Sequence, residues 1–389
     1  MKNNLFNDTE SAFKLKKNFH LYNAVFLFNI ITRKFLVSIF TNLTLLMLKL
    51  RLPIKWVLKN TIYKHFCGGI NLSECNKIIN NMYELKVHSI LDYSVEGLIN
   101  ESSFNKSCNK KINIINSVSK NSAIPFAVFK PTSIGRYELF KSVSLGIELS
   151  KDQLDEWSRV VERFHKICEH AMKMKIKILI DAEEFEVQKA IDDLSVEMMK
   201  NYNKEKVIVY NTIQFYRWDR LSYLNKLFSI EIDRSFKFGF KLVRGAYMEK
   251  ERDLAKINDY KSPICSTKNE TDKNFDNGID LMFSNIKNLS FFVAPHNEKS
   301  NYKVLDLMKN NNLNNNTDKI WFGQLYGMSD NITFNLAKYG YNVAKILPSV
   351  PVENLVPYLI RRAQENSSFE GQSSRELSLL KKELIRRGS

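Results

Sequence analysis

The chain has 389 residues, of which 44% are hydrophobic and 26% are charged, and its mean hydropathy is −0.30. These values are typical of a folded globular protein and argue against a polytopic membrane protein. The net charge of +16 favours an anionic partner, but no RRM, KH, zinc-finger or recognition-helix pattern accompanies it, so nucleic-acid binding is not expected.

The cysteines and histidines indicate neither disulfides nor a metal. There are five cysteines, an odd number, and no CxxC pair joins any of them, so a reducing compartment fits the chain best. His165, Cys168 and His170 are close in sequence, but spacings of three and two do not put three ligands on one helix face. We therefore predict no metal site.

Residues 1–84 are predicted to form an N-terminal helical region. The apolar stretch from Asn23 to Leu50 is broken by Arg33 and Lys34, which leaves runs shorter than a spanning helix needs and favours two amphipathic helices. A helix that crosses a bilayer is the alternative. A signal peptide is disfavoured because Asp8 and Glu10 lie near the start.

From residue 85 to residue 389 the pattern predicts a (β/α)8 barrel followed by C-terminal helices. Amphipathic stretches separate many of the strand-length runs of β-branched and aromatic residues, and eight such runs favour a barrel over the alternative, an open doubly wound sheet. The runs are SILDYS, FAVFK, IKILIDAEE, VIVYNTIQ, FKLVRGAY, FFVAPHN, IWFGQLYG and NVAKILPS.

Polar residues lie at or just beyond the end of each predicted strand. Because the carboxyl ends of parallel barrel strands open on one face, these residues should gather there. They are Asp92, Lys130, Asp181, Gln214, Arg244, Tyr247, His296, Gln324 and Lys345.

A second group of polar residues follows the eighth run, in PYLIRRAQEN. Tyr358, Arg361, Arg362 and Glu365 share one helix face, and two neighbouring guanidinium groups can bind one carboxylate. A solvated basic helix face is the alternative. The chain has no GxSxG, HExxH, P-loop or GxGxxG motif, so the sequence favours chemistry carried by a bound cofactor.

These motifs resemble the proline dehydrogenase family, the flavin-dependent barrel enzymes that oxidise L-proline to Δ1-pyrroline-5-carboxylate. The matching segments are LDYSVEG, IDAEE, KLVRGAYMEKER, HNE, FGQLYGMSDNITF and PYLIRRAQENSS, in this order along most of the chain. The set is similar to the monofunctional branch, which includes the mitochondrial enzymes.

The resemblance implies a role for each matching residue. Arg361 and Arg362 match residues that bind the proline carboxylate, assisted by Lys130, while Tyr358 and Leu325 wall the proline ring. Lys130, Asp181 and Tyr247 are the expected catalytic residues. Gln214, Lys241, Arg244 and His296 match residues that hold FAD, and the hydride is expected to pass from proline C5 to flavin N5.

One position departs from the family pattern. Ile346, in KILPSVP, stands where the family commonly has a tyrosine that borders the substrate ring. A neighbouring branch that favours hydroxyproline also lacks this tyrosine, so a hydroxyproline dehydrogenase is an alternative, and a non-enzymatic basic barrel that binds RNA or membrane is another. Between the two substrates we expect proline to be preferred.

The resemblance also implies partners. Electrons are expected to pass to membrane quinone, and a separate pyrroline-5-carboxylate dehydrogenase is expected to act downstream. The basic surface and the N-terminal helices favour peripheral contact with an anionic membrane. The expected location is the bacterial cytoplasm, peripherally associated with the inner membrane, or the mitochondrial inner membrane if the organism is eukaryotic.

Overall fold

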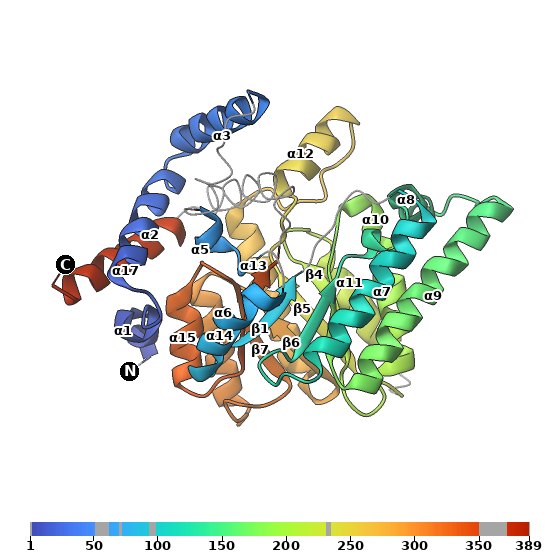
Figure 1. Cartoon of the computed structure of the whole chain (residues 1–389). Helices are drawn as coiled ribbons and strands as arrows, with labels where there is room; N and C mark the ends of the chain where they lie inside the picture. The colour runs from blue at the N-terminus through green and yellow to red at the C-terminus, as the bar shows by residue number, and fades with distance from the viewer. Residues whose placement is uncertain are drawn as a thin grey trace. The chain divides into compact units, whose positions relative to one another are not determined.

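The computed structural model describes residues 2–50, 62–69, 72–92, 99–230, 235–349 and 372–388, coloured along the chain in Figure 1. The chain forms two compact units. Unit 1 contains Met1–Ser89, His296–Tyr302 and Phe322–Ser389, and unit 2 contains Ile90–Pro295 and Lys303–Trp321. The division predicted between residues 84 and 85 remains a prediction.

The strands form a closed barrel in which hydrogen-bonded neighbours follow the chain order from β1 to β8. Each predicted run overlaps one strand, so the predicted (β/α)8 fold is confirmed and the open sheet is excluded. The strands are β1 (His88–Asp92), β2 (Phe126–Phe129), β3 (Lys177–Ile180), β4 (Val209–Gln214), β5 (Phe238–Val243), β6 (Leu289–Val293), β7 (Ile320–Leu325) and β8 (Val343–Pro348).

Helices precede, separate and follow the strands. The α-helices are α1 (Thr9–Ala12), α2 (Asn18–Ile31), α3 (Lys34–Lys49), α5 (Lys64–Phe66), α6 (Leu72–Glu84), α7 (Glu101–Val118), α8 (Tyr137–Leu145), α9 (Lys151–Met174), α10 (Phe185–Tyr202), α11 (Arg220–Ile230), α12 (Met248–Ile257), α13 (Lys268–Ser284), α14 (Glu298–Asn310), α15 (Asp330–Lys338) and α17 (Gln372–Arg386). The 3-10 helices are η1 (Lys2–Asn7), η3 (Pro131–Ser133) and η4 (Ile286–Asn288).

In unit 2, aromatic side chains fill the barrel where its strands begin. Phe126, the first residue of β2, makes edge-to-face contacts with Tyr210, Phe292 and Trp321, with ring centroids 5.7, 5.3 and 5.1 Å apart. Phe126, Tyr210 and Phe292 belong to β2, β4 and β6. This matches the barrel layers that alternate strands build in this fold. The barrel is therefore packed at this end.

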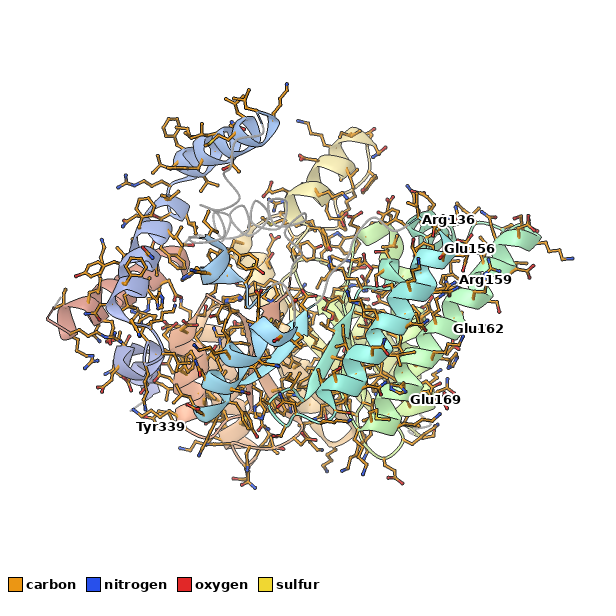
Figure 2. The ribbon with its side chains drawn as sticks, in the orientation of Figure 1. Arg136, Glu156, Arg159, Glu162, Glu169 and Tyr339 are labelled. Atoms are coloured by element: carbon orange, nitrogen blue, oxygen red, sulfur yellow. The ribbon has the colours of Figure 1, made fainter. Side chains whose placement is uncertain are left out.

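Helix α9 shows how the sequence pattern fixes the outer layer. The Ser150 side chain accepts a hydrogen bond from the Gln153 N–H, and the Ser150 N–H donates to Gln153 Oε1, so a capping box starts the helix. Phe164 and Ile167 are buried on its inner face. Figure 2 labels side chains of its other face, among them Glu156, whose Oε2 lies 2.6 Å from a guanidinium nitrogen of Arg136.

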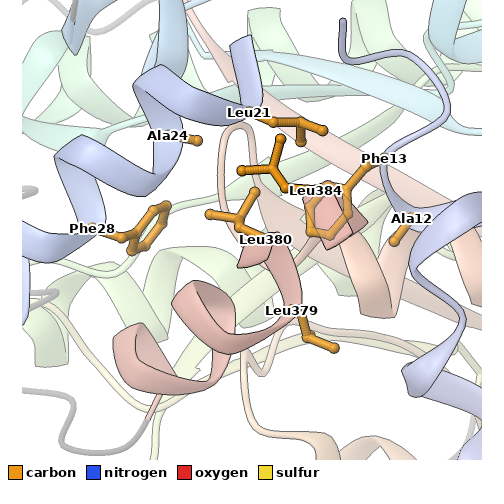
Figure 3. Close-up of a cluster of buried hydrophobic side chains, with 8 residues drawn as sticks. All are labelled: Ala12, Phe13, Leu21, Ala24, Phe28, Leu379, Leu380 and Leu384. Atoms are coloured by element: carbon orange, nitrogen blue, oxygen red, sulfur yellow. The ribbon is translucent and has the colours of Figure 1, made fainter. Parts of the chain in front are cut away.

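The predicted break in the N-terminal helices is confirmed, because α2 ends at Ile31 and α3 begins at Lys34. Among the described residues no single helix is long and apolar enough to cross a membrane. The two helical segments Asn18–Ile31 and Phe35–Thr44 have the required length and composition when they are taken together, but they are bent relative to each other. Helices α1, α2 and α17 share a hydrophobic cluster, shown in Figure 3, in which Leu21 and Phe28 pack with Leu380 and Leu384.

Candidate active site

In unit 2, Lys241 of β5 forms an ion pair with Asp181, which directly follows β3. Lys241 Nζ lies 2.6 Å from Asp181 Oδ1, and the two side chains are only 8% and 19% exposed. The Asp181 N–H donates to the backbone oxygen of Phe129 at 3.0 Å, which fixes the carboxylate relative to β2. The carboxylate thus compensates a cation that would otherwise lie unpaired in an apolar strand.

Gln214, the last residue of β4, carries an unused acceptor. Its Nε2 donates to the backbone oxygen of Glu183 at 3.0 Å, but its buried Oε1 has no partner in the described part of the chain. The Glu183 carboxylate accepts from Thr132 N at 2.8 Å and from Thr132 Oγ1 at 2.6 Å. Burial raises the pKa of Glu183, although the Thr132 hydrogen bonds oppose this. A buried acceptor without a donor is rare and marks a place where a ligand N–H can bind.

Lys130 follows β2 and belongs to the same group of charges. Its positive charge acts to lower the pKa of Glu183. Lys111 of α7 is also buried, and burial lowers its pKa to about 8, while the negative charges of Asp92 and Asp181 act to raise it. Sequence reasoning missed Lys111 and Glu183, since neither immediately follows a strand.

Arg244 lies just beyond β5 and is oriented by helix α13. Its Nε donates to Asp272 Oδ1 at 2.8 Å, and its guanidinium lies 4.4 Å from the ring centroid of Phe275. Burial acts to raise the pKa of Asp272, but the hydrogen bond from Lys268 and the charge of Arg244 bring it below its ordinary value. Sequence reasoning missed Asp272 as this partner.

Gly245 makes the turn after Arg244 possible. Its φ is +133°, and a Cβ atom there would lie 2.0 Å from the Tyr216 ring. The Tyr216 N–H donates to the Arg244 backbone oxygen at 2.7 Å, so the turn lies against β4 and its loop. Tyr247 follows as the half-buried residue that precedes α12.

In unit 1, the structure brings together two of the residues expected to line the substrate. Leu325 of β7 and Ile346 of β8 are register partners, and the Tyr326 N–H donates to the Ile346 backbone oxygen at 2.9 Å. Leu325 also packs against a small cluster that contains Phe66 and Met328. Two apolar side chains are therefore adjacent on β7 and β8.

His296 is linked to the last helix through Ser329. His296 Nδ1 lies 2.9 Å from Ser329 Oγ, and the Ser329 N–H donates to Glu376 Oε2 of α17 at 2.9 Å. Burial and the charge of Asp330 raise the pKa of Glu376 to about 7. Sequence reasoning missed Ser329 and Glu376.

Lys345 belongs to a buried charge cluster. Its Nζ lies 2.8 Å from Asp330 Oδ1 and also donates to the backbone oxygens of Leu325, at 3.3 Å, and Met328. Lys16, which precedes α2, lies 2.7 Å from Asp330 Oδ2. The two cations hold the pKa of Asp330 well below its ordinary value, although burial opposes them. We call Lys16, Asp330 and Lys345 the buried triad.

The buried triad was only partly visible in the sequence. Lys345 was recognised as a polar strand residue, whereas Asp330 and Lys16 were missed. Gln324, another predicted residue at a strand end, is fully buried and accepts from Thr333 Oγ1 at 2.7 Å. Tyr358, Arg361, Arg362 and Glu365 lie outside the described residues.

A closed (β/α)8 barrel with charged and amide side chains at the carboxyl ends of its strands defines a class of enzymes that bind substrate at that end. The family model described as proline dehydrogenase matches residues 75–375. The chain therefore belongs to the proline dehydrogenase family.

Individual relatives support this membership. The chain is 33% identical over 331 residues to the carbapenem antibiotics biosynthesis protein CarD of Pectobacterium carotovorum, covering 85% of each chain. It is 30% identical over 379 residues to the mitochondrial proline dehydrogenase 1 of Dictyostelium discoideum, covering 86% of this chain and 66% of that one. The chain thus spans slightly less than two thirds of the Dictyostelium protein.

Solved structures show the same fold. Proline utilization A from Bdellovibrio bacteriovorus, inactivated by N-propargylglycine, matches with a TM-score of 0.73 at 19% identity. The match covers 83% of this chain but 36% of the Bdellovibrio chain, so this chain corresponds to about a third of that protein.

Proposed function

We propose that this chain is an FAD-dependent enzyme that oxidises L-proline to Δ1-pyrroline-5-carboxylate. The observation that carries the proposal is the Lys241–Asp181 ion pair on a family-matched barrel whose neighbouring strand holds the unpaired Oε1 of Gln214. A buried cation and an unused acceptor on adjacent strands suit a planar heterocycle that has an N–H and gains negative charge on reduction.

The residues present fit a flavin. Gln214 Oε1 would accept a hydrogen bond from the ring, and Lys241 would supply positive charge. Arg244, held by Asp272, would bind the diphosphate tail, and the family resemblance assigns His296 to FAD as well. When bound, FAD would accept at N5 the hydride that leaves proline C5.

The substrate is assigned to the remaining predicted residues. Arg361 and Arg362 would bind the carboxylate with help from Lys130, because paired guanidinium groups suit a carboxylate. Tyr358, Leu325 and Ile346 would wall the ring, and the last two are already adjacent on β7 and β8. Such positioning of two reactants makes a large contribution to rate.

The test is anaerobic mixing of the FAD-supplemented protein with L-proline, followed by absorbance. We expect the flavin absorbance to bleach, whereas a protein that stays colourless after FAD is added would contradict the proposal. Arg361→Met should raise KM for proline and leave the flavin spectrum intact. Arg386→Met, which removes a partly exposed guanidinium from α17, is the matched control and should leave KM unchanged.

Hydroxyproline is the second candidate substrate, and Ile346 favours it. The chain is 27% identical over 417 residues to the hydroxyproline dehydrogenase of Xenopus laevis, covering 97% of this chain. Comparison of kcat/KM for proline and 4-hydroxyproline, repeated with Ile346→Tyr, separates the two. We expect proline to be preferred and Ile346→Tyr to strengthen that preference.

We further propose that electrons pass to membrane quinone and that a separate dehydrogenase consumes the product. The excess of cations and the apolar N-terminal helices support a peripheral position on the bacterial inner membrane, or on the mitochondrial inner membrane in a eukaryote. Proline-dependent reduction of a short-chain quinone, compared with an artificial soluble acceptor, tests this part separately.

A further inference from the structure

Ser329 has a strained backbone in the turn between β7 and α15. Its φ is +52° and its ψ is +41°, the left-handed conformation that residues other than glycine rarely adopt. The residue is also buried, with 6% of its surface exposed. Strain of this kind persists only where the surrounding contacts impose it, and such positions gather at functional sites.

Three polar contacts impose this conformation, and all of them lie within unit 1. The Ser329 N–H donates to Glu376 Oε2 of α17 at 2.9 Å. The Ser329 backbone oxygen accepts from the Ile332 and Thr333 N–H groups of α15, at 3.0 and 3.2 Å. The third contact belongs to the side chain, because Ser329 Oγ lies 2.9 Å from His296 Nδ1. A turn that is fixed by α15 and α17 therefore directs the hydroxyl at the imidazole.

The contact at Nδ1 decides what the other ring nitrogen of His296 can do. When a serine hydroxyl donates to Nδ1, that nitrogen carries no proton, and the neutral imidazole carries its proton on Nε2. Nε2 is then a hydrogen-bond donor. The family resemblance assigns His296 to FAD, whose diphosphate and ring carbonyl oxygens are acceptors, so this tautomer is the one that suits the cofactor.

We propose that Ser329 and Glu376 are positioning residues for His296 and hold its imidazole with Nε2 as the donor to FAD. Ser329 acts on the ring directly, whereas Glu376 acts through the Ser329 backbone. Helix α17, which follows the last barrel strand, thereby takes part in retaining the cofactor. The inference rests on the proposed function, from which it takes the contact between His296 and FAD.

The test is the dissociation constant of FAD, obtained without proline by diluting the FAD-loaded full chain and following the fluorescence of the released flavin. Ser329→Gly is the most informative variant, because glycine adopts a positive φ without strain but has no hydroxyl. We expect this variant to unfold at about the same urea concentration as the wild-type chain, because relief of strain offsets the lost hydrogen bond. It should nevertheless bind FAD about fivefold more weakly.

A double-mutant cycle with His296→Ala tests whether Ser329 acts through the imidazole. His296→Ala alone should weaken FAD binding at least as much as Ser329→Gly does, and the double variant should bind no more weakly than His296→Ala. Ser195→Ala is the matched control for a lost hydroxyl. Ser195 is fully buried and its Oγ donates to the Ile191 backbone oxygen at 2.7 Å within α10, so its loss should leave FAD affinity unchanged.

Glu376 is tested by two substitutions that differ in one atom type. Glu376→Gln keeps an oxygen that accepts from the Ser329 N–H, so FAD affinity should stay within about twofold of wild type. Glu376→Ala leaves this buried N–H without its acceptor and should weaken binding about fivefold. Glu383→Ala, on the same helix, removes a buried carboxylate paired with Arg386 and Arg387 and should leave FAD affinity unchanged.

Three outcomes would overturn the inference. Wild-type FAD affinity in Ser329→Gly would show that the hydroxyl does not position the ring. A full additional loss on the His296→Ala background would show that Ser329 acts by another route. Equal losses in Glu376→Ala and Glu383→Ala would indicate general loosening of α17. A wild-type chain that binds no FAD contradicts the proposed function as well, whereas failure of this inference alone leaves wild-type binding intact.

Discussion

Lys241 Nζ and Asp181 Oδ1 lie 2.6 Å apart and join the carboxyl-terminal halves of β3 and β5 across β4. The pair has few competing waters, because neither side chain is more than a fifth exposed. It pairs the lysine of an otherwise apolar strand with a carboxylate and fixes the position of the ammonium group.

Substitution of Lys241 by Met should have two separable effects. The unpaired Asp181 carboxylate should lower the free energy of unfolding by about 2–4 kcal/mol, measured by urea denaturation. The loss of a cation that stabilises the reduced cofactor should lower kcat by about tenfold or more.

Lys250→Met is the matched control for this prediction. Lys250 Nζ lies 2.6 Å from Glu184 Oε1, but its side chain is mostly exposed. The same chemical change should therefore alter the unfolding free energy by less than about 1 kcal/mol. Equal losses in the two variants would show that the buried position of Lys241 has no special importance.

Among substitutions that remove one charged side chain, Asp330→Asn should cause one of the largest losses in the free energy of unfolding. It leaves Lys16 and the fully buried Lys345 without their shared counter-charge, at an expected loss of about 3–5 kcal/mol in urea unfolding. Asp318→Asn makes the same change at an exposed carboxylate paired with Lys177, and should lose less than about 1 kcal/mol. A mild effect at Asp330 would argue against the buried triad.

Glu376 should make stability depend on pH near neutrality. Its pKa in the folded chain is about 7, above its ordinary 4.5, so over this range the folded state retains a proton that the unfolded state has released. The unfolding free energy should therefore fall as pH rises from 4.5 to about 7, by up to about 3 kcal/mol. Glu376→Gln should remove this dependence and be the more stable form at about pH 8.

Glu383→Gln, on the same helix, should behave in the opposite way. Burial acts to raise the pKa of Glu383, but hydrogen bonds from Arg386 and Arg387 lower it to about 2. Glu383 therefore stabilises the fold above its ordinary pKa of 4.5, and this contribution is lost as pH falls toward 2. Urea unfolding at several pH values should show the Gln variant destabilised at neutral pH, with the slope due to Glu376 retained.

Gly245→Ala should disrupt the turn after β5. The positive φ and the contact with the Tyr216 ring predict a loss of about 3 kcal/mol or more, together with weaker FAD binding measured by fluorescence titration. Gly340→Ala is the control, since Gly340 has φ of +79° but no atom within 4 Å of the added Cβ. Only the backbone strain of about 1 kcal/mol should remain there.

The barrel could be predicted from the sequence because its signal is local. Each strand is a short run of β-branched and aromatic residues followed by polar residues. The spacing of apolar residues along the sequence differs between strands and helices, which separates the two. The break at Arg33 and Lys34 was visible for the same reason, since two cations interrupt an apolar helix. Roles for Leu325 and Ile346 came from the family resemblance, and their adjacency became visible only in the register of β7 and β8.

The partners of the site residues could not be predicted in this way. Asp272 reaches Arg244 from a helix whose own sequence pattern is that of an ordinary capped surface helix. Lys16 meets Asp330, and Glu376 meets Ser329, across long separations in the chain. Such pairings depend on how distant elements approach one another, and neither residue propensity nor spacing records that approach.

The shared cluster of α1, α2 and α17 has a consequence for synthesis. Leu21, Ala24 and Phe28 precede the barrel strands in the chain, but their partners Leu379, Leu380 and Leu384 follow them. Throughout synthesis of the barrel, α2 therefore exposes these apolar side chains without their partners. A nascent chain in this state suits capture by a chaperone or a lipid surface, and the cluster forms only after α17 has left the ribosome.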